Sequence, residues 1–236
     1  MSFSNVLPIY KKELRGYFSS PVAYIVLTVF LLICGWFFSA RLFVEGEASL
    51  RSVFPTVLFL LTLFVPAITM GSLSEERKSG TFELLATMPI ANIEIVVGKY
   101  LAALTLLATA FFFTLTYAVT VKSLGDADVG VMFTGYVGLL LLGAGQVAIG
   151  VLASSLTENQ VVAFIVSFLA LFILSFIDVV LPHVPAAFAS MFEYLSATYH
   201  FTNISRGVLD TRDLVYFASI VVLSLYLAAR ALQRRI

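Results

Sequence analysis

Hydrophobic residues fall into six long runs along this chain, separated by shorter polar segments. In windows of about 19 residues the runs predict membrane-spanning helices at 22–40, 53–72, 98–121, 131–153, 161–181 and 214–232. Each run is close to the roughly 20 residues that a helix needs to cross the hydrocarbon. Helices are expected throughout, because an unpaired backbone amide in lipid is costly and an open sheet cannot avoid it. The pattern predicts an all-α, polytopic membrane protein with six transmembrane helices, in which residues 1–236 form a single transmembrane domain.

A separate helical pattern precedes the first run, at residues 5–19. Plotted at about 100° per residue, its apolar and aromatic side chains share one arc; they are Val6, Leu7, Tyr10, Leu14, Tyr17 and Phe18. This pattern is typical of an amphipathic interfacial helix, with Tyr10 toward the acyl chains and the basic Lys11, Lys12 and Arg15 toward the lipid phosphates. The alternative is a lead-in helix that only sets the topology.

The polar segment between the second and third runs is unusual in a chain of which only 12% of residues are charged. It reads Ser74-Glu75-Glu76-Arg77-Lys78-Ser79-Gly80-Thr81-Phe82-Glu83-Leu84-Leu85-Ala86-Thr87-Met88-Pro89-Ile90. Gly80 or Thr81 can begin a short helix that ends before Pro89, and Glu83 suits its first turn. Apolar side chains ringed by charge would suit a soluble protein partner. The alternative is that they pack against the bilayer.

Composition and charge narrow the class further. A content of 60% hydrophobic residues with 22 Phe does not fit one soluble core, and 14 basic against 14 acidic residues give no basic face for a nucleic-acid partner. Nine of the 14 Lys and Arg lie on the side of the two termini and five on the other, which predicts cytoplasmic termini and a cytoplasmic charged segment. The first run is too long for the apolar region of a signal peptide, so we expect an uncleaved span.

Polar residues inside the runs are the next candidates for chemistry. Gln146 can line a pathway or bond a neighbouring helix, and the second interpretation is favoured. Asp178 lies near the outer end of a run, which favours a hydrated or hydrogen-bonded structural role over a functional one. The small residues of 143–150 should let helices approach closely. Neither His183 nor His200 has a Cys, His or acid at ligand spacing, so no metal site is expected.

The segment 182–213, before the last run, is too apolar for a solvated linker. Its large apolar residues are Phe188, Met191, Phe192, Tyr194, Leu195, Tyr199 and Phe201, which predicts short helices that re-enter the outer leaflet. Arg206 and Asp210 are spaced to pair across one helical turn, and Asp210 to Asp213 can cap the last span. The alternative is a structural lid without contact to any substrate.

Several segments together resemble one protein family. The run from Glu75 to Leu85, followed by Pro89 and Gly98-Lys99, is similar to the cytoplasmic loop of type-2 ABC exporter permeases. The opening Lys11-Lys12-Glu13-Leu14, the turn Ser154-Ser155-Leu156-Thr157-Glu158-Asn159-Gln160 and the segment 200–213 resemble the gliding-associated (Gld-type) branch of that class.

This resemblance implies a permease subunit of an ATP-binding-cassette exporter in the bacterial inner membrane, in contact with membrane lipids. It implies that 74–90 is a coupling helix seated in a separate ABC ATPase subunit and that two permeases, identical or different, form a dimer. Short re-entrant helices before the last span agree with the same resemblance. The residues expected in or beside the ATPase contact are Glu75, Glu76, Arg77, Gly80, Thr81, Phe82, Glu83, Leu84 and Leu85.

No phosphate-binding motif G-x-x-x-x-G-K-[ST] occurs in the chain, and Gly98-Lys99-Tyr100 lacks both the leading glycine and the hydroxyl. We therefore expect no catalytic residue and no cofactor on this chain, with ATP and Mg held by the partner ATPase. The alternative function is a membrane anchor that transmits ATPase motion to a periplasmic partner without transporting a solute. An embedded enzyme or ion-coupled carrier is disfavoured, because the runs lack paired carboxylates or a buried base.

Overall fold

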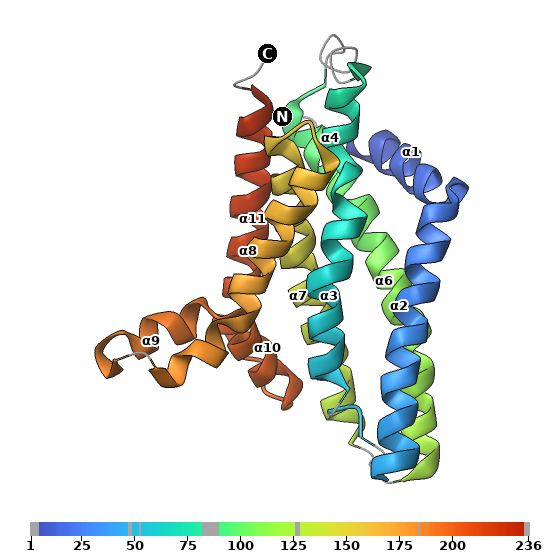
Figure 1. Ribbon diagram of the computed structural model, residues 1–236, viewed down its shortest axis with the longest axis vertical. Helices are drawn as coiled ribbons and strands as arrows, with labels where there is room; N and C mark the ends of the chain where they lie inside the picture. Colours follow the sequence, from blue (N-terminus) through green and yellow to red (C-terminus); the bar gives the residue numbers. More distant parts are fainter. Residues whose placement is uncertain are drawn as a thin grey trace.

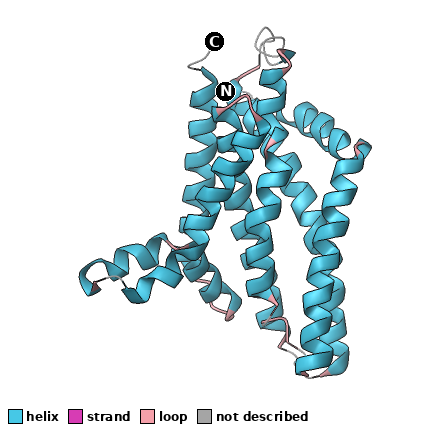
Figure 2. Ribbon diagram, viewed as in Figure 1, coloured by secondary structure: helices cyan, strands magenta, loops and turns pink. Residues whose placement is uncertain are grey.

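The computed structural model describes residues 5–46, 49–51, 53–81, 90–125, 128–183 and 185–233. These residues form helices and turns, with no strand among them (Figure 2). The elements are α1 (Val6–Ser19), α2 (Pro21–Ala40), the π-helical turn η1 (Arg41–Glu45), α3 (Phe54–Thr69), α4 (Gly71–Lys78), α6 (Asn92–Leu124), α7 (Val129–Leu156), α8 (Gln160–Val180), the 3-10 turn η2 (Leu181–His183), α9 (Ala186–Leu195), α10 (Ala197–Ser205) and α11 (Thr211–Gln233).

Six helical segments are long and apolar enough to cross a bilayer, which confirms the all-α, six-span prediction. They are Pro21–Val44, Phe54–Lys78, Asn92–Leu124, Val129–Leu156, Gln160–Val180 and Thr211–Gln233. The helices extend beyond the predicted runs at several ends, most clearly in span two, which continues to Lys78, and in span three, which begins at Asn92. The backbone stays helical where the side chains turn polar, and hydropathy windows detect only the apolar part.

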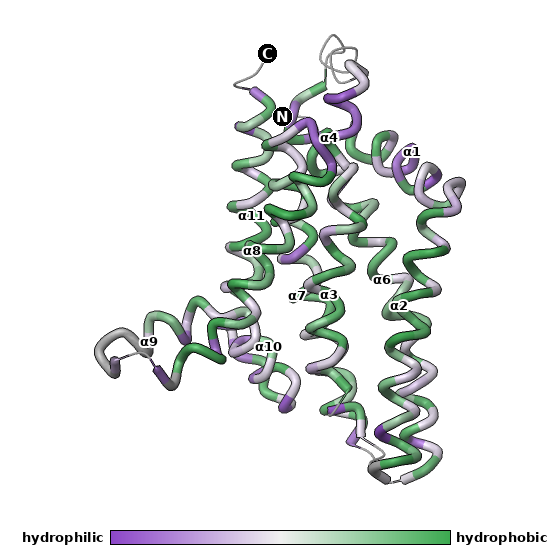
Figure 3. Tube along the Cα trace, in the orientation of Figure 1, coloured by the Kyte–Doolittle hydropathy of each residue, from purple (hydrophilic) through white to green (hydrophobic). Residues whose placement is uncertain are grey.

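Both chain termini lie at one end of the bundle, which we call the terminal end (Figure 1). α1 lies across this end, beside the start of α2, and the polar stretches of α1 and α4 gather there (Figure 3). α7 is the central helix and contacts α3, α6, α8, α10 and α11. Its apolar window is 67% buried, against 22% for α8 and 28% for α2. The outer helices therefore leave most of their apolar surface for lipid or for another membrane protein.

Glycines allow α7 to lie close to its neighbours. A Cβ atom on Gly143 would lie 2.6 Å from Leu107 on α6. A Cβ on Gly150 would overlap the side chain of Thr69 on α3, at 2.8 Å from its Cβ. The predicted close approach of helices along 143–150 is confirmed, since a Cβ at Gly150 would overlap Thr69 and a Cβ at Gly143 would displace the Leu107 side chain.

Span two is divided at Met70, where α3 ends and α4 begins. The backbone N–H groups of Leu73 and Ser74 donate to the hydroxyl of Ser154 on α7, at 3.0 and 3.1 Å. The same hydroxyl donates to the Met70 carbonyl at 2.9 Å. Met70 itself supplies no side-chain cap, so Ser154 performs the role of an N-cap from a different helix.

α1 packs directly on α6. A Cβ on Gly98 of α6 would lie only 2.7 Å from Ile9 Cγ2, so glycine is needed for this approach. The hydroxyls of Tyr10 and Thr105 share a hydrogen bond of 3.2 Å. α1 is therefore anchored to the bundle through one face, and its place at a membrane surface stays a prediction.

The short helices α9 and α10 occupy the segment predicted to re-enter the membrane, and their depth in a bilayer stays a prediction. Asp210 accepts a hydrogen bond from the backbone N–H of Arg212 at 2.9 Å, at the start of α11. This bond lowers the pKa of the Asp210 carboxyl. The predicted pair between Arg206 and Asp210 is wrong. α10 ends at Ser205, Gly207 takes a φ of +96°, and no ion pair joins the two among the described residues.

Asp213 is buried rather than placed as a cap, at 2% exposure. Its Oδ1 lies 2.6 Å from Nδ1 of His200, which is 1% exposed. Nε2 of His200 lies 3.0 Å from the carbonyl oxygen of Tyr194, and the ring stacks on Tyr216 at 4.0 Å between centroids. His200, on α10, thus contacts both α9 and α11. Its partner on α11, Asp213, is 13 positions away in the sequence.

We expect His200→Leu to lower the stability of the purified protein by about 1–3 kcal/mol, because it leaves the buried Asp213 side chain without its hydrogen-bond partner. The thermal unfolding midpoint in detergent measures this loss. His183→Leu is the matched control, since His183 is exposed. Equal midpoints for the two variants would contradict a structural role for the His200–Asp213 pair.

Candidate functional site

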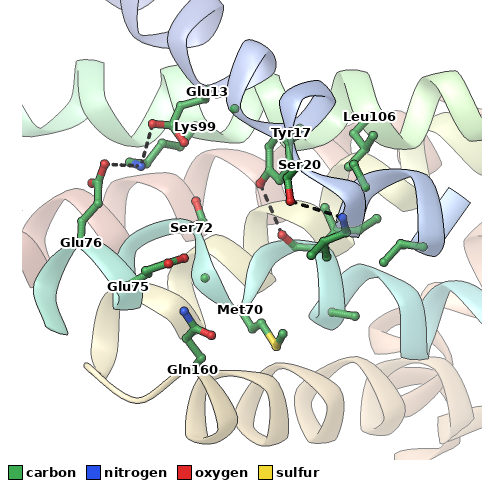
Figure 4. Close-up of a pocket in the computed structure, with 17 residues that line it drawn as sticks. Glu13, Tyr17, Ser20, Met70, Ser72, Glu75, Glu76, Lys99, Leu106 and Gln160 are labelled. Carbon is green, nitrogen blue, oxygen red and sulfur yellow. Dashed lines mark hydrogen bonds and ion pairs between the residues drawn. The ribbon is translucent and has the colours of Figure 1, made fainter. Parts of the chain in front are cut away.

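A buried cluster of charges lies at the terminal end, where α1, α4 and α6 meet. The ammonium of Lys99 on α6 lies 3.1 Å from Glu13 Oε1 on α1 and 3.0 Å from Glu76 Oε1 on α4 (Figure 4). The Lys99 side chain is only 2% exposed, against 18% for Glu13 and 16% for Glu76. One cation thus connects three helices, and we call these three residues the charge cluster.

The sequence around each member explains the geometry. Lys99 follows Gly98, where α1 lies too close to α6 to leave room for a Cβ. Glu13 is four residues after Ile9, so both lie on the face of α1 that meets α6. A buried cation is stabilised only when its partners compensate the lost hydration, and the two carboxylates do so here. Lys12, with 65% of its side chain exposed, lies 3.6 Å from Glu76 at the rim of the charge cluster.

The first turn of α6 is also bonded to α1. Glu94 accepts hydrogen bonds from the backbone N–H and the side-chain amide of Asn5, both at 3.2 Å. It also accepts from the backbone N–H of Ala91 at 3.0 Å, which caps the start of α6. α1 is thereby held by Glu94 at Asn5, just before its first residue, and by Lys99 at Glu13 in its middle.

The opposite side of α4 is held by Arg77. Its guanidinium donates to the carbonyl oxygen of Ser155 at 2.5 Å and lies 3.7 Å from the carboxylate of Glu158. The Arg77 side chain is 8% exposed. α4 is therefore bonded to α1 and α6 through Glu76, and to the connection between α7 and α8 through Arg77.

The structure separates the residues predicted at the coupling segment into two groups. Glu76 and Arg77 are engaged inside the chain, whereas Glu75 and Thr81 are exposed. Gly80 takes a φ of +71° just after α4, a conformation that glycine adopts readily, so the chain turns there. The remaining predicted residues lie outside the described part of the chain: Phe82, Glu83, Leu84 and Leu85. On α1, Lys11 and Arg15 are exposed, whereas Tyr10 is half-buried.

A cavity of about 510 Å³ adjoins the charge cluster, between α1, α2, the α3–α4 junction and α6 (Figure 4). Its polar wall includes the charge cluster, Ser72 and Glu75, and Gln160 at the start of α8 borders it. Its other wall is apolar. No sequence pattern indicates this cavity, because it depends on how α1 folds back onto the spans.

The predicted bond from Gln146 to a neighbouring helix is wrong. Gln146 is 3% exposed, and neither its Oε1 nor its Nε2 has a hydrogen-bond partner among the described residues. It faces a narrow cavity of about 10 Å³ together with Ser175, whose hydroxyl is also without a partner. That volume is close to the minimum that holds one water molecule.

At the other end of the bundle, Asp178 is half-buried and lines a cavity of about 460 Å³ with Arg51 and Arg206. This cavity lies between α3, α8 and α10 and is mostly apolar. Over the described part of the chain, no three His, Cys, Asp or Glu side chains lie close enough to hold a metal ion.

Six helices long and apolar enough to cross a bilayer, with α1 docked on α6 and a charged extension of span two at the terminal end, indicate a polytopic membrane protein. Comparison with known families then narrows the class. The family described as ABC-2 family transporter protein matches residues 7–231. The chain belongs to this family, whose members are transmembrane permeases of ABC transporters. The predicted permease class is thereby confirmed, and the gliding-associated branch stays a prediction.

Two curated relatives are similar over part of their length. They are the probable multidrug ABC transporter permease YbhR of Escherichia coli strain K12 and the protein of the same description from strain O157:H7. Each is 26% identical over 161 residues, which is 66% of this chain and 43% of the relative. The aligned part of the chain thus spans less than half the length of the curated relatives it matches.

Proposed function

We propose that this chain is the membrane-spanning permease subunit of an ABC exporter in a bacterial inner membrane, driven by a separate ATPase that binds ATP and Mg. In this proposal the terminal end faces the cytoplasm and residues 74–90 contact the ATPase. The excess of Lys and Arg at this end supports the orientation. Membership in the ABC-2 transporter family supports the class.

The observation that carries the proposal is the double attachment of α4. A force applied to the segment after Gly80 reaches α4 first. From α4 it reaches α1 and α6 through Glu76 and Lys99, and the α7–α8 connection through Arg77. Because Glu76 is paired with Lys99 and Lys12, a movement of α4 should carry α6 and α1 with it. ATP-driven motion of a partner at 74–90 would thereby shift the bundle between two states.

A second permease subunit is part of the proposal, and α8 is the helix best suited to meet it. Four phenylalanines recur at every fourth position of α8, and adjacent rings lie 4.4–6.2 Å apart; they are Phe164, Phe168, Phe172 and Phe176. The α8 window is only 22% buried within one chain. Because the curated relatives are described as probable multidrug permeases, small drug-like compounds are the first cargo to test.

We expect the affinity-purified chain to bring down an ABC ATPase subunit in mild detergent, and Glu83→Lys together with Lys78→Glu to reduce its recovery at least about tenfold. A pair of charge reversals at a protein contact costs several kcal/mol when like charges meet. Quantitative mass spectrometry of the eluate measures the recovery.

Lys122→Glu, at the opposite end of the bundle, is the control and should leave the recovery unchanged. Unchanged recovery in the 74–90 variant would remove this segment from the interface, and failure to recover any ATPase would overturn the transporter proposal. If the ATPase binds but no compound is moved in a vesicle assay, the membrane-anchor alternative is supported instead.

A further inference from the structure

The cavity at the terminal end carries a surplus of negative charge. Three carboxylates line it, those of Glu13, Glu75 and Glu76, against the single ammonium of Lys99. Lys99 and the rim residue Lys12 both pair with Oε1 atoms of Glu13 and Glu76. Even with both lysines counted, three negative charges face two positive ones.

Two polar atoms in the wall of this cavity have no hydrogen-bond partner among the described residues. They are Oε2 of Glu76 and the hydroxyl oxygen of Ser72, and both are buried. Ser72 is only 8% exposed. A buried carboxylate oxygen without a donor is costly, so this wall is suited to a ligand that donates hydrogen bonds.

Two further polar groups of the cavity wall lie close to Gly71. The carboxylate of Glu75 and the side-chain amide of Gln160 both lie within 4 Å of the position that a Cβ of Gly71 would take. Glu75 is exposed. It forms no ion pair with another described residue, so its charge is available at the mouth of the cavity (Figure 4).

The opposite wall is apolar and belongs to membrane-spanning helices. It consists of Val22, Ala23 and Val26 of α2, Ala67 and Ile68 of α3, and Leu106 of α6. The volume of about 510 Å³ is typical of pockets for small molecules. A ligand that fills the cavity must therefore have an apolar body and a cationic, hydrogen-bond-donating head.

We propose that this cavity binds an amphiphilic cation, a primary ammonium on an apolar body. The exposed carboxylate of Glu75 pairs with the ammonium, and the Ser72 hydroxyl and Glu76 Oε2 are further hydrogen-bond acceptors in the same wall. The apolar body lies along α2, α3 and α6. The head of an aminophospholipid and a free lipophilic amine offer this same chemistry. This binding requires neither an ATPase nor transport, so it goes beyond the proposed function and can be tested separately.

The test is native mass spectrometry of the purified full chain in detergent, with dodecylamine and the neutral dodecanol as probes. We expect dodecylamine to bind, roughly tenfold more weakly to Glu75→Gln and about threefold more weakly to Ser72→Ala, because each variant removes one partner of the ammonium. Dodecanol should bind more weakly than dodecylamine and equally to all variants. Lys11→Gln, which removes an exposed charge at the same end but outside the cavity, is the control.

Phosphatidylethanolamine and phosphatidylglycerol, added separately, identify the source of the cation. Binding of phosphatidylethanolamine that depends on Glu75 supports a lipid ligand, and binding of dodecylamine alone supports a free amine. Equal binding of dodecylamine to Glu75→Gln and the unchanged chain overturns the proposal. Tighter binding of dodecanol or of phosphatidylglycerol overturns it as well. Size-exclusion profiles verify that each variant is folded.

Discussion

Lys99→Met is expected to destabilise this protein by about 3–5 kcal/mol, as the removal of one partner from a buried ion pair does. The variant leaves the carboxylates of Glu13 and Glu76 side by side in a largely buried place, without the cation that both now contact at 3.0–3.1 Å. Their mutual repulsion should also release α1 from α4. Thermal unfolding in detergent measures the loss of stability, and protease sensitivity of α1 measures its release.

Lys12→Met is the control for this experiment. Lys12 contacts the same two carboxylates at longer distances, 3.6 and 3.8 Å, but 65% of its side chain is exposed, so its removal should cost less than about 1 kcal/mol. Adding Glu13→Gln and Glu76→Gln to Lys99→Met should restore most of the stability, because no uncompensated charge remains. Equal effects of the two lysine variants would show that Lys99 does not hold the helices together.

Gly150→Ala should destabilise the helix bundle by about 1–3 kcal/mol or more. Its new methyl group would meet the side chain of Thr69 at less than ordinary contact distance, and both residues lie on well-packed helices. α7 must then move away from α3, beside the Ser154 hydroxyl that caps α4. The fraction of folded protein after size-exclusion chromatography, together with the unfolding midpoint, measures the effect.

Gly145→Ala, on the same helix, is the matched control. A Cβ at Gly145 would lie 3.5 Å from its nearest neighbour, Ile220, which is ordinary van der Waals contact. The double variant Thr69→Gly with Gly150→Ala should recover part of the stability, because removal of the Thr69 side chain from α3 makes room for the new methyl group on α7. A Gly150→Ala midpoint equal to that of Gly145→Ala would contradict the close packing of α3 and α7.

The six spans could be predicted from the sequence because lipid requires long apolar helices, and hydropathy detects such helices directly. The helix ends could not be predicted in the same way. Span two continues as α4 because Ser154, 84 residues after Met70, supplies a hydroxyl at the break. No local signal in either segment indicates this tertiary contact.

The charge cluster was missed for a related reason. The sequence predicts only that Lys12 faces the lipid phosphates, and Lys99 and Glu13 lie in segments that resemble a protein family. Their meeting with Glu76 depends on the folding of α1 back onto α6. Two signals were present in the sequence: Lys99 lies inside the predicted run 98–121, where an ionisable residue needs a partner, and Gly98 precedes it.

Some of the residues expected at a partner surface are exposed and others are bonded within the chain. Periodicity in the sequence does not predict this difference in exposure. The sequence placed Glu75, Glu76 and Arg77 together, whereas the helical geometry of α4 turns Glu76 and Arg77 to opposite neighbours and leaves Glu75 exposed. The same limitation applies to His200 and Asp213, whose pairing joins two helices across the turn that contains Gly207.

The cap that Ser154 provides has a consequence for bilayers of different thickness. A span that is too long or too short for its membrane adjusts by tilting, and a continuous helix would carry that tilt into its polar extension. Span two is interrupted at Met70, and the first turn of α4 is fixed to the central helix α7 rather than to α3 alone. We therefore expect hydrophobic mismatch at α3 to leave the position of α4 nearly unchanged.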